Sequence, residues 1–452
     1  MGLTARLQTL EQEGRPIRVA VIGAGQMGSG LARQVAHLPG MRLAGLCDVI
    51  VERAVAAAAQ AEVPAAVGDS RRAVRQLLGD GHVAITAQAD WLLDVPEVDA
   101  VLDATGDPDT GARLALATLA LRKPFITMNV EADATVGPLL ASMARNAGTV
   151  YTVAAGDEPS VLCEMVDFAR AIGLEVMCAG KGKNNRLDRS ATMQAVAPEA
   201  AARGMSARML AAFVDGTKTM VEMAALSNAT GLLPDCPGMH GPRVDLADLL
   251  HTFVPQSDGG ILHGRGVVDY AIGDVAPGVF LIVTTPSEAV RRDLAYLKAG
   301  DGPYYLLSRP FHLASLEAPL SVARAVLYGE VTMAAVGAPL AECLAAAKRD
   351  LRAGEVLDGI GGETVYGLTD TAVRTATARA VPIGVVHGAR VRRDVACGTV
   401  LTTEDVALDE TATIVQLLHQ QDAMVDEGML HHTAPAALVT AGTEGTPGET
   451  AC

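Results

Sequence analysis

The sequence predicts an α/β protein of several domains whose N-terminal part is a doubly wound parallel sheet. The chain has 452 residues, and at ~150 residues per domain this length corresponds to about three domains. Half of the residues are hydrophobic but only 3% are aromatic, so aliphatic, alanine-rich cores are expected, which favour helices over an all-β sandwich. Short apolar runs alternate with helical patterns from Ile17 to Met128, as a parallel sheet requires.

The first βαβ unit begins at the β-branched run 17–22. This run ends at the turn Gly23-Ala-Gly-Gln-Met-Gly28, after which a helical pattern continues to Pro39-Gly40. A second strand is predicted at 41–48. A strand, a glycine turn, a helix and a strand in close succession form the first unit of a doubly wound fold. Further strands are predicted at 98–103 and 124–128, and helices at 51–61 and 111–121.

A second, α+β domain is expected from Val150 onward, where the pattern changes. Strands are predicted at 151–155, 175–179 and 279–284, and helices at 160–172, 197–210, 219–229 and 321–328. The last of these helices is expected to pack on the first domain. The segment 232–278 is rich in Gly, Pro and His, which predicts loops and short strands.

The C-terminal part contains a local repeat. Lys348-Arg-Asp-Leu-Arg-Ala-Gly-Glu-Val-Leu357 is similar to Arg392-Arg-Asp-Val-Ala-Cys-Gly-Thr-Val-Leu401. Each copy combines a charged turn, a glycine and a short strand, which predicts a small β domain. The predicted domains are therefore 1–150, 151–335 and 336–425, followed by a tail, 426–452, whose aperiodic Thr, Gly, Ala, Pro and Glu composition predicts disorder.

Charge and cysteine usage argue against several classes of protein. The formal net charge of −16 argues against a nucleic-acid partner, which would need a basic surface. We find no uninterrupted apolar stretch of ~18 residues and no signal peptide, so no membrane association is expected. The seven cysteines are scattered and never in CxxC spacing, which predicts free thiols in a reducing compartment. We expect a cytoplasmic protein that acts on a small molecule.

The glycine turn carries the fingerprint of a dinucleotide-binding Rossmann domain, because it follows a strand, opens a helix and precedes Asp48 by twenty positions. Gly23 permits the tight turn, Gly25 lets the backbone approach a pyrophosphate, and Gly28 allows close helix–strand packing. The helix N-terminus offers N–H groups to the phosphates. A carboxylate at Asp48 accepts hydrogen bonds from ribose hydroxyls and repels a 2′-phosphate, so NAD is favoured over NADP.

Four further cofactor-binding candidates follow later strands, where a doubly wound sheet places its ligand crevice. The complete predicted set is Gly23, Gly25, Gln26, Met27, Gly28, Asp48, Thr105, Gly106, Asn129 and Glu131. For each of the last four residues, an ordinary strand-end turn is the alternative interpretation.

Longer motifs point to a family. They are Asn129-Val-Glu-Ala-Asp133, Ala155-Gly-Asp-Glu-Pro-Ser160, Ala179-Gly-Lys-Gly-Lys-Asn-Asn185 and Asp215-Gly-Thr-Lys-Thr-Met-Val-Glu222. With them the chain resembles, over residues 15–410, the homoserine-dehydrogenase-like oxidoreductases that carry a C-terminal SAF domain. Within that group it is most similar to the DXR-like reductoisomerases, which convert 1-deoxy-D-xylulose 5-phosphate to 2-C-methyl-D-erythritol 4-phosphate. The resemblance implies a catalytic and dimerisation domain in the middle, an SAF-like β-clip at the C-terminus, and a homodimer.

Two departures from the family pattern bear on the reaction. Reductoisomerase-type members prefer NADPH and have basic residues after the second strand, whereas this chain has Cys47 and Asp48. Homoserine dehydrogenases have a lysine beside the asparagine after the fifth strand, whereas Asn129 is followed by Val130 and Glu131. Homoserine is therefore not the expected substrate.

Two lysines, Lys181 and Lys183, alternate in a glycine-flanked segment directly after the strand predicted at 175–179. On an extended backbone, alternate side chains lie on the same side. Two ammonium groups on one side suit a phosphate, a carboxylate or a developing oxyanion. A solvated basic loop is the alternative.

Two acidic positions have less specific signals. Asp157 and Glu158 lie between a strand and a helix, and one of them is a candidate to hold either a substrate hydroxyl or a divalent ion. For the ion, Mg²⁺ or Mn²⁺, Glu131 is a further candidate ligand, since a reductoisomerase needs a cation. Helix capping is the equally weighted alternative. Lys218 and Glu222 are spaced i, i+4 on a predicted helix, which suits either a simple intrahelical pair or a catalytic lysine oriented by a carboxylate.

The histidines give no zinc signal, because the sequence contains no HxxxH or HExxH pair. His240 and His312 are therefore interpreted as single structural or exposed residues.

The leading functional hypothesis is an NAD(P)-dependent oxidoreductase that acts on a small hydroxylated carbonyl compound bearing a phosphate or carboxylate. The predicted catalytic residues are Lys181, Lys183, Lys218, Glu222 and Asp157, with the lysines binding or protonating the substrate oxygen. The sharper version is a reductoisomerase that depends on Mg²⁺ or Mn²⁺. The alternatives are a metal-independent alcohol or aldehyde dehydrogenase and a non-catalytic dinucleotide sensor whose SAF-like domain binds a partner.

Overall fold

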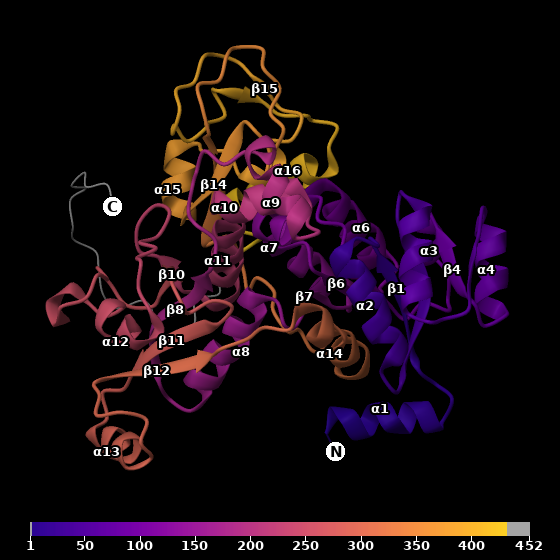
Figure 1. The fold of residues 1–452 in the computed structure, drawn as a ribbon, viewed down its shortest axis with the longest axis horizontal. Helices are drawn as coiled ribbons and strands as arrows, with labels where there is room; N and C mark the ends of the chain where they lie inside the picture. The colour runs from indigo at the N-terminus through magenta and orange to yellow at the C-terminus, as the bar shows by residue number, and fades with distance from the viewer. Residues whose placement is uncertain (1, 432–452) are drawn as a thin grey trace. The chain divides into compact units, whose positions relative to one another are not determined.

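The computed structural model of the chain describes residues 2–431 (Figure 1). These residues divide into two compact units. The first contains the residues up to Ser160 together with Leu313–Ala334 and Ala412–Leu417. The second contains Val161–His312, Ala335–Thr411 and the described residues from Leu418 onward. Of the tail predicted at 426–452, Asp426 ends a helix, and the part beyond 431 lies outside the described residues.

The first unit is built on a seven-stranded parallel sheet with the order β3-β4-β2-β1-β5-β6-β7. Its strands are β1 (Ile17–Ile22), β2 (Met41–Cys47), β3 (Ala65–Val67), β4 (Val83–Thr86), β5 (Ala100–Asp103), β6 (Phe125–Thr127) and β7 (Tyr151–Val153). Strand β1 pairs with β2 on one side and with β5 on the other, so the winding reverses beside β1. The predicted doubly wound sheet is confirmed, although sequence analysis missed the short, alanine-containing strands β3 and β4.

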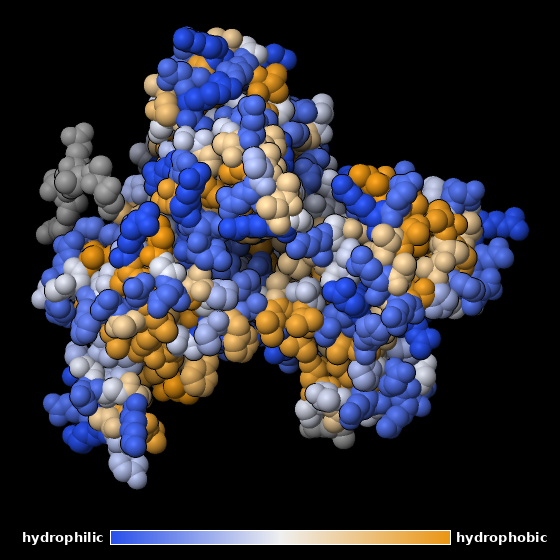
Figure 2. Space-filling model, in the orientation of Figure 1, coloured by the Kyte–Doolittle hydropathy of each residue, from blue (hydrophilic) through white to orange (hydrophobic). Residues whose placement is uncertain are grey.

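The helices of the first unit include those that join successive strands, as a parallel sheet requires. They are α1 (Leu3–Gln12), α2 (Gln26–His37), α3 (Val51–Gln60), α4 (Arg71–Gly79), α5 (Asp90–Leu93), α6 (Pro108–Ala120), α7 (Val130–Ala147) and α14 (Ala314–Tyr328), with α8 (Glu158–Ala171) and α16 (Thr413–Asp426) beginning in this unit. Ala318 and Val322 of α14 are buried in the same core as Leu31 of α2. The prediction that this helix packs on the first domain is confirmed. Apolar surface is visible where α14 lies in Figure 2, and Leu316 of this helix is exposed.

Helix α7 buries an acidic side chain, Asp133, in the first unit. Burial raises the pKa of this carboxyl to about 7, and the hydroxyl of buried Tyr151 opposes the rise only in part. The folded-state pKa lies above the unfolded value of 3.8. Between these two values the native state therefore binds more protons than the unfolded chain, and stability falls as pH rises.

We expect Asp133→Asn to remove this pH dependence. At ~1.4 kcal/mol per pKa unit, the wild-type protein should lose about 4 kcal/mol of unfolding free energy, relative to the variant, between about pH 4 and pH 7. Denaturant unfolding at a series of pH values measures the difference. Asp80→Asn, at an exposed position of the same unit, is the control and should follow the wild-type profile. Parallel profiles for wild type and Asp133→Asn would contradict the assignment.

The second unit contains a mixed five-stranded sheet with the order β12-β11-β8-β10-β9. Its strands are β8 (Glu175–Lys183), β9 (Leu233–Pro234), β10 (Val267–Ile272), β11 (Val279–Thr284) and β12 (Tyr304–Arg309), and Figure 1 shows β8, β10, β11 and β12 side by side. Strand β8 pairs parallel with β10 and antiparallel with β11. It extends beyond the end predicted at 179, so Lys181 and Lys183 lie within the strand and not after it.

The helices and turns of the second unit include α9 (Met193–Ala202), α10 (Ala207–Val214), α11 (Thr217–Thr230), α12 (Leu249–Thr252), α13 (Glu288–Tyr296), α15 (Ala372–Ala378) and the 3-10 turns η1 (Leu246–Asp248), η2 (Gln256–Asp258) and η3 (Ile383–Val385). The single helix predicted at 197–210 is wrong. The chain forms two helices there, separated near Gly204, whose φ of +64° is a left-handed conformation that an α-helix cannot contain.

The C-terminal β domain of the second unit contains β13 (Ala341–Ala347), β14 (Val365–Thr371), β15 (Arg390–Val391) and β16 (Val406–Ala407). The two repeated segments pair with each other about a local pseudo-two-fold axis. Leu351 and Val395 occupy equivalent positions and exchange both backbone hydrogen bonds, at 2.8 and 3.0 Å. The repeat seen in the sequence is thus one symmetric structure and not two independent turns.

Each copy of the repeat caps the glycine turn of the other. Asp394 Oδ1 accepts a 2.9 Å hydrogen bond from the Ala353 amide, and Asp350 Oδ1 accepts one of the same length from the Cys397 amide. The charged turns of the repeat therefore satisfy backbone donors across the pseudo-two-fold axis.

Two sequence expectations about membranes and thiols can be compared with residues 2–431. None of the helices in this range combines the length and apolarity needed to cross a membrane. The six cysteines that the structure describes are all free thiols.

Candidate functional site

In the glycine turn after β1, two of the three glycines have a steric reason, and the third leaves open space. Gly23 has φ of +95°, and a Cβ there would lie 2.6 Å from the carbonyl oxygen of Ala104. A Cβ on Gly28 would lie 1.8 Å from the carbonyl oxygen of Gly23. A Cβ on Gly25, in contrast, would meet no atom within 4 Å. Gly23 and Gly28 are thus required by the turn itself, whereas the exposed backbone at Gly25 leaves room for a ligand to approach.

The turn opens α2 at the edge of the sheet where nucleotides bind in doubly wound folds. Helix α2 begins at Gln26 with Gly25 as its N-cap, and Gln26 and Met27 are exposed. The turn follows the carboxyl end of β1, beside which the strand order reverses. A helix N-terminus at this place presents backbone N–H groups and a positive dipole end to phosphates. The predicted residues around the turn therefore fit a pyrophosphate.

Asp48 follows β2 and holds the glycine turn in place. Its Oδ2 accepts a 2.8 Å hydrogen bond from the Ala24 amide, and its Oδ1 accepts one of the same length from the Ile50 amide. Each carboxylate oxygen can accept a second hydrogen bond, so these contacts leave acceptor capacity for ribose hydroxyls. The neighbouring Val49 side chain is 86% exposed and offers apolar surface beside the carboxylate.

The candidates that follow later strands lie in different environments. Asn129 is fully buried, and its side chain accepts from the Ala132 amide at 3.1 Å as the N-cap of α7. Glu131 is buried as well. Thr105 is half-buried and Gly106 is exposed. The structure therefore places Thr105 and Gly106 where a ligand can reach them and places Asn129 and Glu131 within the scaffold.

A buried network supports this edge of the sheet. Asp103 accepts hydrogen bonds from the hydroxyls of Thr105 and Thr127, at 2.8 and 3.0 Å. Burial raises the pKa of Asp103, and these hydrogen bonds oppose the rise. The backbone amide of Asn129 joins the network by donating to the Thr127 hydroxyl at 2.8 Å. These hydrogen bonds join the ends of β5 and β6.

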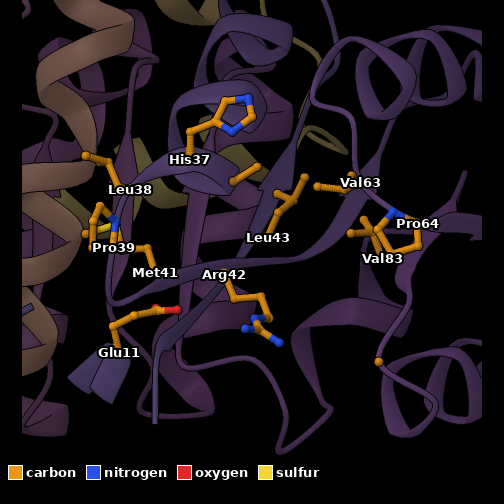
Figure 3. A pocket seen from close by; sticks show the side chains of 12 residues that line it. Glu11, His37, Leu38, Pro39, Met41, Arg42, Leu43, Val63, Pro64 and Val83 are labelled. Atoms are coloured by element: carbon orange, nitrogen blue, oxygen red, sulfur yellow. The ribbon is translucent and has the colours of Figure 1, made fainter. Parts of the chain in front are cut away.

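A pocket of the first unit lies at the other end of the same strands (Figure 3). It is lined by side chains at the start of β2, including Met41 and Leu43, and by Val83 at the start of β4. Nucleotides bind at the carboxyl ends of the strands in such sheets. This pocket is therefore not the dinucleotide site.

The second unit brings three of the predicted catalytic residues together. Glu222 of α11 forms a buried ion pair with Lys181 of β8, and its other carboxylate oxygen lies 3.8 Å from Lys218 Nζ. The Lys181 and Lys218 side chains are 5% and 12% exposed. We refer to Lys181, Lys218 and Glu222 as the lysine–glutamate cluster. The i, i+4 pair predicted for Lys218 and Glu222 is present, and Glu222 also pairs with Lys181 of β8. The catalytic role of Lys218 stays a prediction.

The surroundings of Glu222 are electropositive. Burial by itself would raise the pKa of this carboxyl, but the charges of Lys181 and Lys218 outweigh burial, with a smaller contribution from His312, and the pKa is lowered. Glu222 is therefore ionised at neutral pH, and the cluster is a cationic environment suited to an anionic group or a developing oxyanion.

Lys183 lies on the same side of β8 as Lys181, as the alternation predicted. It is buried, and its ammonium donates to the carbonyl oxygen of Phe213 near the end of α10. A cation at the C-terminal end of a helix is electrostatically favourable. The solvated-loop alternative is wrong for both lysines, because both are buried.

A second buried ion pair supports the cluster, and sequence analysis missed it. Lys348 Nζ lies 2.8 Å from Asp215 Oδ2 and also donates to the carbonyl oxygens of Ala191 and Gly362. Asp215 in turn accepts from the amide of Thr217, the first residue of α11. The C-terminal β domain thus helps to hold the start of the helix that carries Lys218 and Glu222.

Asp157 and Glu158 are buried and lie in the first unit. The lysine–glutamate cluster lies in the second unit. The predicted catalytic residues are therefore distributed over both units.

Sequence analysis also missed a set of metal-ligand side chains in the second unit. Asp235, His240 and His263 converge there, although no sequence pattern links them. Of the two interpretations given for His240, the structure fits a structural histidine and not an exposed one, since its side chain is 12% exposed and contacts Asp269 at 2.7 Å and Asp235 at 3.5 Å.

Three protein families match successive parts of the chain. The family described as "Oxidoreductase family, NAD-binding Rossmann fold" matches residues 17–127. "Oxidoreductase DRL, catalytic domain" matches residues 156–318, and "SAF domain" matches residues 344–407. The chain is thus an NAD(P)-dependent oxidoreductase with an NAD-binding Rossmann domain and a C-terminal SAF domain.

Solved structures that match the chain include dehydrogenases. A probable dehydrogenase from Thermotoga maritima is 14% identical over 70% of this chain and 90% of its own, with a TM-score of 0.40. A myo-inositol dehydrogenase from Corynebacterium glutamicum is 12% identical over 70% of this chain and 89% of its own, with a TM-score of 0.39. A search of curated protein sequences finds no match.

Proposed function

We propose that this oxidoreductase reduces a small hydroxylated carbonyl compound that carries a phosphate or carboxylate group. The observation that supports this substrate class most directly is the buried Glu222 carboxylate held between Lys181 and Lys218. Bound dinucleotide would supply the hydride, which goes to the carbonyl carbon while the carbonyl oxygen takes a proton. The residues of the second unit would bind that oxygen and provide the proton.

Lys218 is the best candidate for direct contact with the substrate. Its side chain is the more exposed of the two cluster lysines. An ammonium group beside the carbonyl oxygen stabilises negative charge as it develops there and then delivers a proton. Glu222 would orient both lysines, and Lys181 would hold the carboxylate from the strand side.

NAD(H) is the cofactor that the Rossmann domain supports, and we propose that Asp48 sets the preference over NADP(H). We expect Asp48→Asn to lower the dissociation constant of NADPH relative to that of NADH by about tenfold or more, since the charge that repels the 2′-phosphate is lost. The asparagine retains an oxygen that can accept from the Ala24 amide. Fluorescence titration with each dinucleotide measures the ratio. Glu52, exposed on α3, provides the control, and Glu52→Gln should leave the ratio of the two dissociation constants unchanged. An unchanged ratio in Asp48→Asn would show that Asp48 does not select the cofactor.

The finer proposal is a reductoisomerase reaction on 1-deoxy-D-xylulose 5-phosphate, which would need Mg²⁺ or Mn²⁺. Asp157 and Glu158 were the predicted ligands. In the part of the chain that the structure describes, no set of three His, Cys, Asp or Glu side chains includes them. Their role as metal ligands stays a prediction, and no catalytic step is assigned to a metal there.

The decisive experiment follows the absorbance of NADH, and separately of NADPH, with 1-deoxy-D-xylulose 5-phosphate in the presence of Mn²⁺ and with divalent ions chelated. Oxidation that requires the metal supports the reductoisomerase. Oxidation of another phosphorylated or carboxylated carbonyl compound without metal supports a plain dehydrogenase instead. If no anionic carbonyl compound is reduced while NADH binds, the proposed substrate class is wrong.

The homodimer implied by the sequence resemblance stays a prediction. Sedimentation equilibrium of the full chain measures it directly.

A further inference from the structure

Three side chains from separated segments of the second unit meet outside the lysine–glutamate cluster. One ligand atom each from Asp235, His240 and His263 lies within 4.8 Å of the others. Asp235 follows β9, His240 lies in the loop that contains Gly238 and Gly241, and His263 precedes β10. The proposed reaction uses none of these residues.

The distances within this group match the spacing of ligands around a metal ion. Asp235 Oδ2 lies 3.5 Å from His240 Nε2 and 3.1 Å from His263 Nδ1. Two ligand atoms that each bind a tetrahedral ion at about 2.0 Å lie about 3.3 Å apart. The carboxylate oxygen is thus already at ligand spacing from both imidazole nitrogens.

His240 is oriented by a buried carboxylate. Asp269 of β10 is fully buried, and its Oδ2 lies 2.7 Å from His240 Nδ1. The same carboxylate accepts from the amides of His240 and Gly241, at 3.2 and 3.0 Å, so it fixes the backbone as well as the ring. His240 Nε2 is buried and makes no hydrogen bond within residues 2–431. A carboxylate on one ring nitrogen and a metal on the other is a recurrent arrangement at zinc sites.

Asp269, which orients His240, points to the opposite face of the sheet from Lys181. In the β8–β10 pairing, Asp269 is opposite Gly180, and the next residue, Tyr270, is opposite Lys181. Successive side chains of a strand point to opposite faces. The Asp269 side chain therefore points away from the face that carries Lys181.

We propose that Asp235, His240 and His263 bind a divalent transition-metal ion, with Zn²⁺ the best fit, and that Asp269 is the positioning residue for His240. Two imidazole nitrogens and one carboxylate oxygen are a donor set that zinc favours, whereas Mg²⁺ and Ca²⁺ prefer oxygen ligands throughout. The His263 side chain is 53% exposed, so solvent can reach the ion and supply the fourth ligand. The ion joins three segments and stabilises the folded chain by mass action.

The test is zinc binding by the full chain after treatment with a chelator. Titration against a chromogenic zinc indicator should show one Zn²⁺ per chain, and Co²⁺ should give the visible absorption of a tetrahedral site. His263→Ala changes an exposed side chain and should lower the affinity by at least 100-fold without unfolding the protein. Asp269→Asn should lower it by about 10- to 100-fold. His251→Ala, an exposed histidine on α12, is the matched control and should bind zinc as the wild type does.

Thermal unfolding gives a second measurement that does not depend on enzyme activity. Zinc should raise the Tm of the wild type and of His251→Ala, and should leave the Tm of His263→Ala unchanged, while Mg²⁺ should have no effect on any of them. Absence of stoichiometric zinc in the wild type, or full affinity in His263→Ala, would overturn the proposal. The group would then be a hydrogen-bonded network in which His240 is held between two carboxylates.

Discussion

Lys218→Met is expected to lower kcat by about 10²- to 10⁴-fold, the range that a single general acid contributes. The reason is that Lys218 is the more exposed ammonium of the lysine–glutamate cluster, and methionine preserves its length while removing the charge and the proton. Lys218 lies on α11 and is not among the residues proposed to bind the dinucleotide, so the dissociation constant of NADH should not change. Steady-state kinetics with the substrate found by the dinucleotide oxidation assay measures kcat, and fluorescence titration measures NADH binding.

Lys298→Met, at an exposed position of the same unit, is the control for this substitution and should retain wild-type kinetics. A wild-type kcat in Lys218→Met would remove this lysine from the mechanism. Loss of NADH binding together with activity would point to misfolding instead, which circular dichroism would detect.

Glu222→Gln separates positioning from proton transfer in the same cluster. The neutral amide no longer stabilises the two ammonium groups, so the pKa of a catalytic lysine should fall. The alkaline limb of the kcat profile, where the lysine loses its proton, should therefore move to lower pH. Lys218→Met should instead flatten this limb. A purely structural role for Glu222 would lower activity at all pH values without moving the limb.

Lys348→Met is expected to produce the largest loss of stability, about 3–5 kcal/mol of unfolding free energy. Lys348 and Asp215 are both buried, with ammonium and carboxylate 2.8 Å apart. Loss of the lysine leaves the Asp215 carboxylate buried without its cation. It also removes the hydrogen-bond donor to the carbonyl oxygens of Ala191 and Gly362. An uncompensated buried charge is more costly than the absence of both partners.

The double variant Asp215→Asn/Lys348→Met tests this explanation. We expect the double variant to be more stable than Lys348→Met alone. In the double variant the Asp215 carboxylate, which Lys348→Met leaves buried without a cation, is also removed. Denaturant unfolding of the wild type, both single variants and the double variant gives the coupling energy. Arg352→Met breaks an exposed ion pair with Asp394 and should have little effect. Additive losses in the double variant would show that the pair does not act as a unit.

Local sequence patterns determined the dinucleotide-binding half of the site. Glycines could be predicted at positions 23 and 28 because Gly23 has a left-handed φ and a Cβ on Gly28 would meet the carbonyl oxygen of Gly23, and both requirements are local. Gly25 has no such steric requirement and was predicted from the spacing of the dinucleotide-binding fingerprint. Asp48 could be predicted because the βαβ unit places it a known number of residues after the turn. The buried run 279–284 was predicted in full for the same reason, since a short β-branched segment forms a strand in most contexts.

Tertiary structure decided which side chains meet. Lys181 and Lys183 alternate in the sequence, yet Lys181 pairs with Glu222 and Lys183 donates to a helix carbonyl. Only the packing of α11 and α10 against β8 determines which lysine has which partner. Lys348 and Asp215 are far apart in the chain, and each by itself resembles an ordinary surface charge. The same holds for His240 and its partners, which no spacing rule connects.

The C-terminal repeat shows both contributions in one element. Its two charged glycine turns were visible in the sequence because each turn is a local structure. Their pairing, with Asp350 and Asp394 each capping the turn of the other copy, was not visible. The sequence by itself thus determined the fold class, the dinucleotide turn and the repeat, because backbone sterics and hydrophobic period act over a few residues. Only the tertiary structure decided the ion pairs and the histidine group. Folding brings together charged residues that are far apart in the chain, and each buried charge is then stable only beside its partner.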